Sequence, residues 1–157
     1  MVETAFSELA KAVGAEGSCP EREMEKGPDC LWRWAEFNWV IECKTQNKDS
    51  IHKKDSGQLH DSLQWFFDTY GKDQRAQPLM ITPVTVTDGD AHLPEECLAM
   101  SEAQLFEFLD ALEGFYHALI ANPGTRANPK AVKTLQEKSG LTPEQILKRF
   151  TNKLRKK

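Results

Sequence analysis

The sequence predicts an α/β fold, with a mixed central sheet of about four strands flanked by helices and followed by a basic helical extension. Segments with apolar residues at helical spacing alternate along the chain with segments rich in aromatic and β-branched residues. A length of 157 residues is typical of one domain and allows a hydrophobic core without disulfides or structural metals. With 39% hydrophobic residues, a chain that is disordered throughout is excluded.

The first half of the chain predicts a helix and then two strands. Apolar residues at helical spacing predict a short amphipathic helix over residues 3–13. Residues 17–28 are rich in glycine, proline and charge, which predicts an irregular stretch with at most one short edge strand. Two aromatic segments, 30–34 and 37–44, predict two strands joined by a tight connection. A polar loop is expected over 45–55.

The second half predicts helices around one further strand. An apolar stripe predicts a helix from Ser56 to Tyr70, and residues 79–86 predict a strand in which Pro83 marks an edge or a bulge. The clearest helical pattern covers residues 101–121. Two short helical patterns follow, and the second begins at Thr142 as N-cap, with proline at the first helical position and glutamine at the capping-box position.

Charge is distributed unevenly between the body and the tail. The net charge of −4 is unfavourable for nucleic-acid binding, but residues 130–157 contain nine Lys or Arg and two acids, a net +7. The remaining 129 residues carry 11 basic and 22 acidic residues, a net −11. Two interpretations of the tail stay open, a solvated tail and a nucleic-acid contact. We therefore divide the chain into a domain of residues 1–125 and a basic helical extension of residues 126–157.

Several classes of protein are disfavoured. No apolar run approaches the roughly 18 to 20 residues that span a bilayer, and the first residues lack the pattern of a secretory signal. The four cysteines are widely spaced without a C-x-x-C pair, which argues against a zinc knuckle and a disulfide framework. We expect reduced thiols in a cytoplasmic protein that does not contact a membrane.

The strand over residues 37–44 carries the candidate chemistry. Side chains alternate along a strand, so Glu42 and Lys44 share one face, and burying them there is costly unless they are paired or bind a ligand. Asp29 begins the preceding strand. If the two strands pair as an antiparallel hairpin, Asp29 lies beside the end that carries Glu42 and Lys44.

Two carboxylates and the backbone carbonyl of Cys43 would form an all-oxygen site that suits Mg²⁺ or Mn²⁺. The neighbouring Lys44 ammonium suits a phosphate or an attacking water. Together these groups are suited to metal-assisted hydrolysis of a phosphodiester bond.

These residues resemble a known family. Pro28-Asp29 followed by Glu42-Cys43-Lys44 is similar to the signature of the PD-(D/E)xK nuclease superfamily, which has the restriction-endonuclease-like fold. Gln58 resembles the glutamine that many members carry on the next helix, and Glu8 stands where several members, archaeal Holliday-junction resolvases among them, place another metal-binding acid. The resemblance covers roughly residues 5–120. The stretch 51–59 with Trp65, Phe66 and Tyr70 is similar to nuclease-like domains fused to bacterial helicases.

The resemblance implies a DNA endonuclease, dependent on Mg²⁺ or Mn²⁺, that acts in restriction, defence or repair. It implies metal ligands at Asp29, Glu42, the Cys43 carbonyl and Glu8, and catalytic roles for Asp29, Glu42, Lys44 and Gln58. RNA stays open as a substrate, and a helicase or ATPase partner or a homodimer is expected. Gln58, Asp61, Ser62 and Trp65 should line one groove, since they share a helix face.

Basic residues near the site and in the tail are the expected contacts to nucleic acid. They are Lys48, Lys53, Lys54, Lys148, Arg149, Lys153 and Arg155.

A second function class stays open, a non-catalytic nucleic-acid-binding or scaffold module on the same fold. Under that interpretation Glu42 and Lys44 form an exposed cross-strand pair, and Asp29 is a turn residue. Gln58 and Glu8 are then ordinary helix residues that face solvent. Convergence of Asp29, Glu42 and Lys44 distinguishes the two classes, because a scaffold does not need it.

Overall fold

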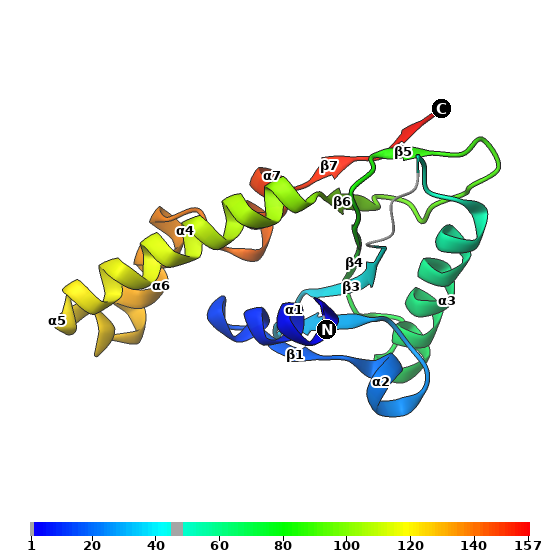
Figure 1. The fold of residues 1–157 in the computed structure, drawn as a ribbon. Coiled ribbons are helices and arrows are strands. Elements are labelled where there is room, and N and C mark those ends of the chain that lie inside the picture. The colour runs from blue at the N-terminus through cyan, green and yellow to red at the C-terminus, as the bar shows by residue number, and fades with distance from the viewer. Residues whose placement is uncertain (1, 45–48) are drawn as a thin grey trace. The chain divides into compact units, whose positions relative to one another are not determined.

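A computed structural model describes residues 2–44 and 49–157 and divides the chain into two compact units (Figure 1). The first unit comprises Met1–Ser101 together with Asn152–Lys157, and the second comprises Glu102–Thr151. The predicted boundary at residue 125 therefore differs from the observed division. The long helix after residue 101 groups with the helices that follow it, and the last six residues return to the sheet. No helix in the described ranges is long and apolar enough to cross a membrane.

The elements alternate along the first unit and are helical throughout the second. The helices are α1 (Val2–Ala12), α2 (Pro20–Met24), α3 (Lys53–Tyr70), α4 (Glu102–Ala121), α5 (Pro123–Arg126), α6 (Pro129–Lys138) and α7 (Pro143–Phe150). The strands are β1 (Glu16–Ser18), β2 (Cys30–Arg33), β3 (Asn38–Cys43), β4 (Ala76–Ile81), β5 (Val86–Thr87), β6 (Leu98–Met100), β7 (Asn152–Lys153) and β8 (Arg155–Lys156).

The main sheet is mixed, as predicted, but within the described ranges it has six strands in the order β1-β2-β3-β4-β6-β7 rather than about four. Strand β2 is antiparallel to both β1 and β3, whereas β3, β4 and β6 run parallel. Helix α3 connects β3 to β4, as a parallel pair requires. Strand β7 returns antiparallel to β6, and β8 continues into a small second sheet with β5.

Side-chain alternation along β3 separates two core layers, in agreement with the predicted alternation. On one face Trp39 stacks on Trp32 at a centroid distance of 5.0 Å, and Trp32 stacks on Phe6 of α1 at 4.7 Å. On the other face Val40 packs with Leu31 and with Phe66 of α3. Helices α1 and α3 therefore cover opposite faces of the sheet, and α3 covers the face that also carries Glu42.

Helix α3 begins at Lys53, three residues before the predicted start. His52 is its N-cap, and the Asp55 carboxylate accepts a hydrogen bond from the His52 backbone N–H at 3.1 Å, which closes a capping box. A sequence pattern that requires serine or threonine at the N-cap does not identify this capping box, because its N-cap is a histidine. As a result the end of the predicted loop belongs to the first turn of α3.

Strand β4 shows how a proline is accommodated inside a sheet. In the parallel ladder between β4 and β6, the Thr82 N–H donates to Met100 O at 3.0 Å. Continuing this register back along β4, a backbone N–H at residue 78 would donate to Glu96 O. Pro78 has no N–H to donate. The Gln77 side-chain amide donates to Glu96 O instead, at 2.6 Å. The predicted strand 79–86 is thus two elements, β4 and β5, and Pro83 lies exposed between them.

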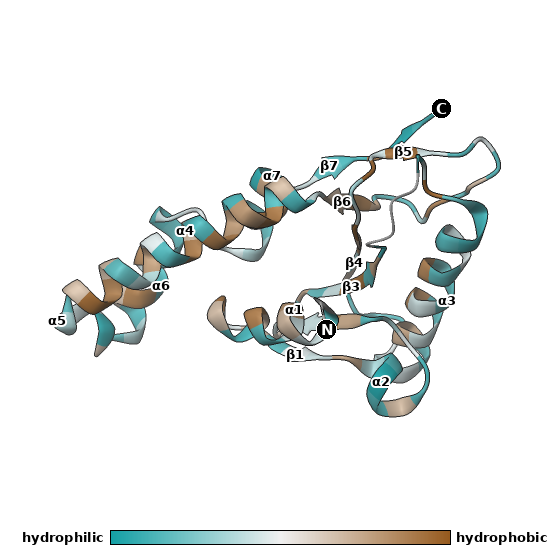
Figure 2. Cartoon of the chain, in the orientation of Figure 1, coloured by the Kyte–Doolittle hydropathy of each residue, from teal (hydrophilic) through white to brown (hydrophobic). Residues whose placement is uncertain are grey.

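The second unit is a small helical assembly with its own apolar contacts. Helix α4 buries Phe108, Leu112, Phe115 and Leu119, and Phe108 lies 5.5 Å from the ring of Phe150 on α7. Figure 2 shows hydrophobic and hydrophilic residues alternating along α4, as expected of a helix buried on one side. The predicted capping box at Thr142 is confirmed at the start of α7.

Candidate active site

Pairing of β2 with β3 places Asp29 beside the end of β3, as the hairpin hypothesis predicted. Cys30 lies opposite Ile41, so Asp29 is at the level of Glu42. One oxygen of Asp29 (Oδ2) accepts a hydrogen bond from the Cys43 backbone N–H at 2.7 Å. The N–H and C=O of a strand residue point to the same edge, so the Cys43 carbonyl lies on the Asp29 side of β3.

Glu42 is buried, and both of its carboxylate oxygens are hydrogen-bonded. Its exposed fraction is 4%, Oε1 accepts from the Ser62 hydroxyl at 2.7 Å, and Oε2 accepts from Lys44 Nζ at 2.9 Å. Lys44 Nζ also lies 3.9 Å from Asp29 Oδ2. The side chains of Glu42 and Lys44 are 5% and 19% exposed. An exposed cross-strand pair is therefore the wrong description of these two residues.

Burial and neighbouring charges have opposing effects on the pKa values of Glu42 and Lys44. Burial and the nearby Asp29 charge raise the pKa of Glu42, and they outweigh the Lys44 ammonium and the hydrogen bonds that lower it. Burial alone would lower the pKa of Lys44, but the charge and hydrogen bond of Glu42 raise it on balance. Lys44 consequently stays protonated, and it is the cation that neutralises part of the carboxylate charge.

Glu21 on α2 is a third carboxyl group of the cluster, and no sequence pattern identified it. A hydrogen bond to the Asp29 side chain, together with burial and the charges of Asp29 and Glu42, raises the pKa of Glu21 to about 7. The stretch around it was expected to be irregular. The one available signal was Pro20, which stands at the first helical position of α2.

A cavity of about 300 Å³ opens onto this cluster, between α2, β3 and the middle of α3. Its lining includes Glu21, Glu42, Gln58, Asp61, Ser62 and Trp65. The four α3 residues predicted to share one groove are therefore brought together in one cavity that Glu42 also lines. Gly27, with φ of +103°, lies beneath Trp65, where a Cβ atom would approach the indole ring to 2.9 Å.

The donor chemistry of this cluster suits a hard divalent cation, because carboxylate and carbonyl oxygens are its preferred ligands. Crowded carboxyl groups with raised pKa values are also what such a cation would stabilise in the charged form. Across residues 2–44 and 49–157, however, no three His, Cys, Asp or Glu side chains are arranged as a ready metal site. The two oxygens of Glu42 are held by Lys44 and Ser62, so binding an ion requires these groups to move.

The other predicted residues are scattered. Glu8 does not line the cavity, and its exposed side chain pairs with Lys11 on the same helix at 2.7 Å. Lys53 and Lys54 are exposed in the first turn of α3. Arg149 of α7 donates to the carbonyls of Ser139 and Gly140 at 2.7 and 3.2 Å.

Four predicted contacts to nucleic acid remain. Lys148 is exposed on α7 in the helical unit, whereas Lys153 and Arg155 belong to β7 and β8 in the unit that carries the cavity. Lys48 lies outside the described residues. The predicted basic tail is therefore divided between the two units.

Comparison with protein-family models, with curated proteins and with solved structures found no match to this chain.

Proposed function

We propose that this protein is a metal-dependent nuclease that hydrolyses phosphodiester bonds of DNA, built on a restriction-endonuclease-like core. The observation that carries the proposal is the convergence of Asp29 and Lys44 on Glu42, which lines a cavity. A buried acid and ammonium beside two further carboxyl groups are costly to maintain for folding alone. Perturbed pKa values in a cleft are characteristic of functional sites.

The chain's own groups have distinct proposed roles. Asp29, Glu42 and the Cys43 carbonyl would hold Mg²⁺ or Mn²⁺, and Glu21 is a further candidate ligand. When bound, the ion supplies Lewis-acid polarisation of the phosphoryl group. Lys44 stabilises negative charge that develops on the scissile phosphate.

Helix α3 supplies the groups that position these residues. Ser62 holds Glu42 through its hydroxyl hydrogen bond at 2.7 Å. Gln58, four residues earlier on the same helix face, lines the cavity and can contact a phosphate or the attacking water. Trp65 closes the cavity against Gly27.

The direct test incubates purified protein with labelled single-stranded, duplex and branched DNA and with RNA, in Mg²⁺, Mn²⁺ or EDTA. Cleavage should require the cation and should fall by about 10²-fold or more in Lys44→Ala, which is the scale of one electrostatic donor. Lys11→Ala is the matched control, because Lys11 pairs with an exposed acid instead. Equal activity in Lys44→Ala and wild type would contradict the proposed role.

Calorimetry with Mn²⁺ tests the ion site independently of cleavage. Binding should disappear in Asp29→Ala and Glu42→Ala and persist in Glu8→Ala, because Glu8 does not line the cavity. Loss of binding in Glu8→Ala alone would place the ion elsewhere.

The alternative proposal is a non-catalytic nucleic-acid-binding or scaffold module, and one observation favours it. Ser62, Lys44 and the Cys43 N–H already satisfy oxygens of Glu42 and Asp29, so the cluster can exist as a closed structural network. Under this alternative the protein binds nucleic acid or a partner with unchanged affinity in EDTA. It cleaves none of the substrates in either cation.

A further inference from the structure

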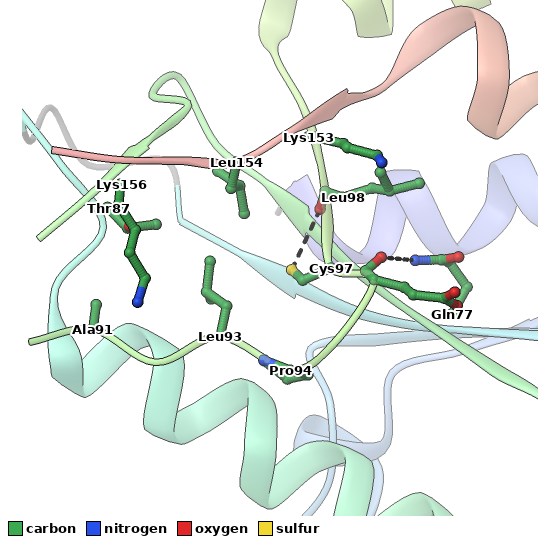
Figure 3. A pocket seen from close by; sticks show the side chains of 11 residues that line it. Gln77, Thr87, Ala91, Leu93, Pro94, Cys97, Leu98, Lys153, Leu154 and Lys156 are labelled. Atoms are coloured by element: carbon green, nitrogen blue, oxygen red, sulfur yellow. Dashed lines mark hydrogen bonds between the residues drawn. The ribbon is translucent and has the colours of Figure 1, made fainter. Parts of the chain in front are cut away.

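A second cavity, of about 590 Å³, lies in the same unit and shares no lining residue with the first (Figure 3). One wall is the segment from Ala91 to Leu98, and the opposite wall is the C-terminal strand segment 153–156. Figure 3 shows Leu93 and Leu154 pointing toward one another from the two walls. We call this cavity the basic groove, because two lysines of the strand segment line it.

The walls of the basic groove are fixed to the core. Leu93 and Leu154 pack against the buried cluster of Ile51, Leu59, Met80 and Cys97. The Gln77 amide holds the loop wall through its hydrogen bond to Glu96 O at 2.6 Å. A groove built in this way keeps its shape without a ligand.

The strand wall is held by backbone pairing of β7 with β6 and of β8 with β5. Lys153 is in register with Leu98 of β6, and Arg155 and Lys156 are in register with Val86 and Thr87 of β5. The backbone N–H of Lys157 donates to Thr87 O at 3.0 Å. The cations of this segment therefore project from a fixed strand rather than from a free tail.

Charge in the basic groove is positive. Lys153 and Lys156 line it, and neither forms an ion pair with an acid among the described residues. In Figure 3 the Lys156 side chain extends from the strand toward the loop wall. Burial raises the pKa of Cys97 to about 12, so that thiol is neutral, and Glu96 is the one acidic residue in the lining.

We infer that the basic groove binds the sugar–phosphate backbone of one polynucleotide strand. This inference rests on the proposed function and assigns its substrate contact to residues 153–156 rather than to the helical part of the tail. Two ammonium groups pair with phosphates, and the aliphatic walls accept the sugars. No aromatic side chain lines the groove, so recognition is through the backbone and does not depend on base sequence.

The test measures binding of full-length protein to a labelled single-stranded oligonucleotide and to its duplex, in EDTA and over a series of salt concentrations. In Lys153→Ala/Lys156→Ala the affinity should fall by roughly tenfold or more, and the salt slope for the single strand should flatten by about 1.4, or two contacts at about 0.7 each. The control double variant is Lys133→Ala/Lys138→Ala, which removes the same charge from exposed positions of the helical unit. Equal losses in the two double variants would overturn the inference.

A variant that is expected to tighten binding distinguishes a lost contact from a misfolded protein, because misfolding would only weaken binding. Glu96→Gln removes the acid from the groove and should tighten binding, whereas Glu95→Gln, at the exposed neighbouring position outside the lining, should not. Unchanged affinity in Glu96→Gln would contradict the groove. The single-stranded and duplex arms report which form supplies the bound strand.

Failure of the inference and failure of the proposed function give different results. Cleavage in Mn²⁺ that is insensitive to all four groove and control variants would overturn the groove alone. Groove-dependent binding without cleavage in any cation would overturn the nuclease and leave the groove intact. Absence of polynucleotide binding by the wild type would overturn both.

Discussion

Replacing Lys44 with methionine should destabilise the fold, because it leaves a buried carboxylate without its cation. Methionine keeps most of the aliphatic stem and removes the ammonium that lies 2.9 Å from Glu42 and 3.9 Å from Asp29. Breaking a buried ion pair from one side costs about 3–5 kcal/mol. Since the Lys44 side chain is 19% exposed, we expect the lower end, about 3 kcal/mol, or a melting temperature lower by roughly 6–12 °C.

Urea denaturation at neutral pH measures this loss, and two controls define its origin. Lys11→Met breaks an ion pair whose side chains are 65% and 64% exposed, and it should cost no more than about 1 kcal/mol. Glu42→Gln/Lys44→Met removes both charges and should recover most of the lost stability. A Lys44→Met variant no less stable than Lys11→Met would refute the argument that this pair is buried and coupled.

The pH dependence of the same variant has a definite sign. Glu42 has a pKa raised by burial, so in the folded protein it takes up a proton more readily than in the unfolded chain. Its contribution to stability is therefore present at low pH and is lost as the pH rises through its folded pKa. Removing Lys44 raises that pKa further. The deficit of Lys44→Met relative to wild type should shrink as the pH falls toward 4.

The remaining predictions concern Glu21 and two glycines. The pKa of Glu21 is raised to about 7, so Mn²⁺ that binds there must displace a proton. The affinity for Mn²⁺ should therefore increase between about pH 6 and 8. In Glu21→Gln, calorimetry should show an affinity that depends less on pH and a smaller release of protons. Gly27→Ala should cost about 1–3 kcal/mol in chemical denaturation, since its φ is +103° and a Cβ atom would meet the Trp65 ring. Gly57→Ala should instead stabilise the protein by about 0.5–1 kcal/mol, because it lies in α3 with open space around it; a loss there would contradict the helix geometry.

The site was predictable from the sequence because side chains repeat at a fixed period along strands and helices and because paired strands have a defined register. Alternation along 37–44 separated Glu42 and Lys44 from the tryptophan face, and antiparallel pairing then placed Asp29 beside them. Helical spacing likewise brought Gln58, Ser62 and Trp65 to one cavity. These inferences succeed because they depend on local geometry, which is the same in every strand and helix.

Features that depend on distant partners were not predictable in this way. Strands β6, β7 and β8 are only two or three residues long and exist because neighbouring strands offer free backbone groups. Glu21 joins Asp29 only through the path of α2, which no periodic pattern encodes. Glu8 satisfied the helical pattern equally well, but its position on α1 directs it to solvent.

The pairing of β6 with β7 has a consequence for how the chain is assembled. Ala99 faces Asn152 across the ladder, so the whole helical segment between them is an insertion whose two ends meet like those of a hairpin turn. Closing a flexible loop of this length costs roughly 3–4 kcal/mol in entropy by the logarithmic rule, and prior folding of the helices can offset part of that cost. During synthesis the sheet stays incomplete until the insertion has emerged, so the basic groove, which needs residues 153–156, forms only after the helical unit has been made.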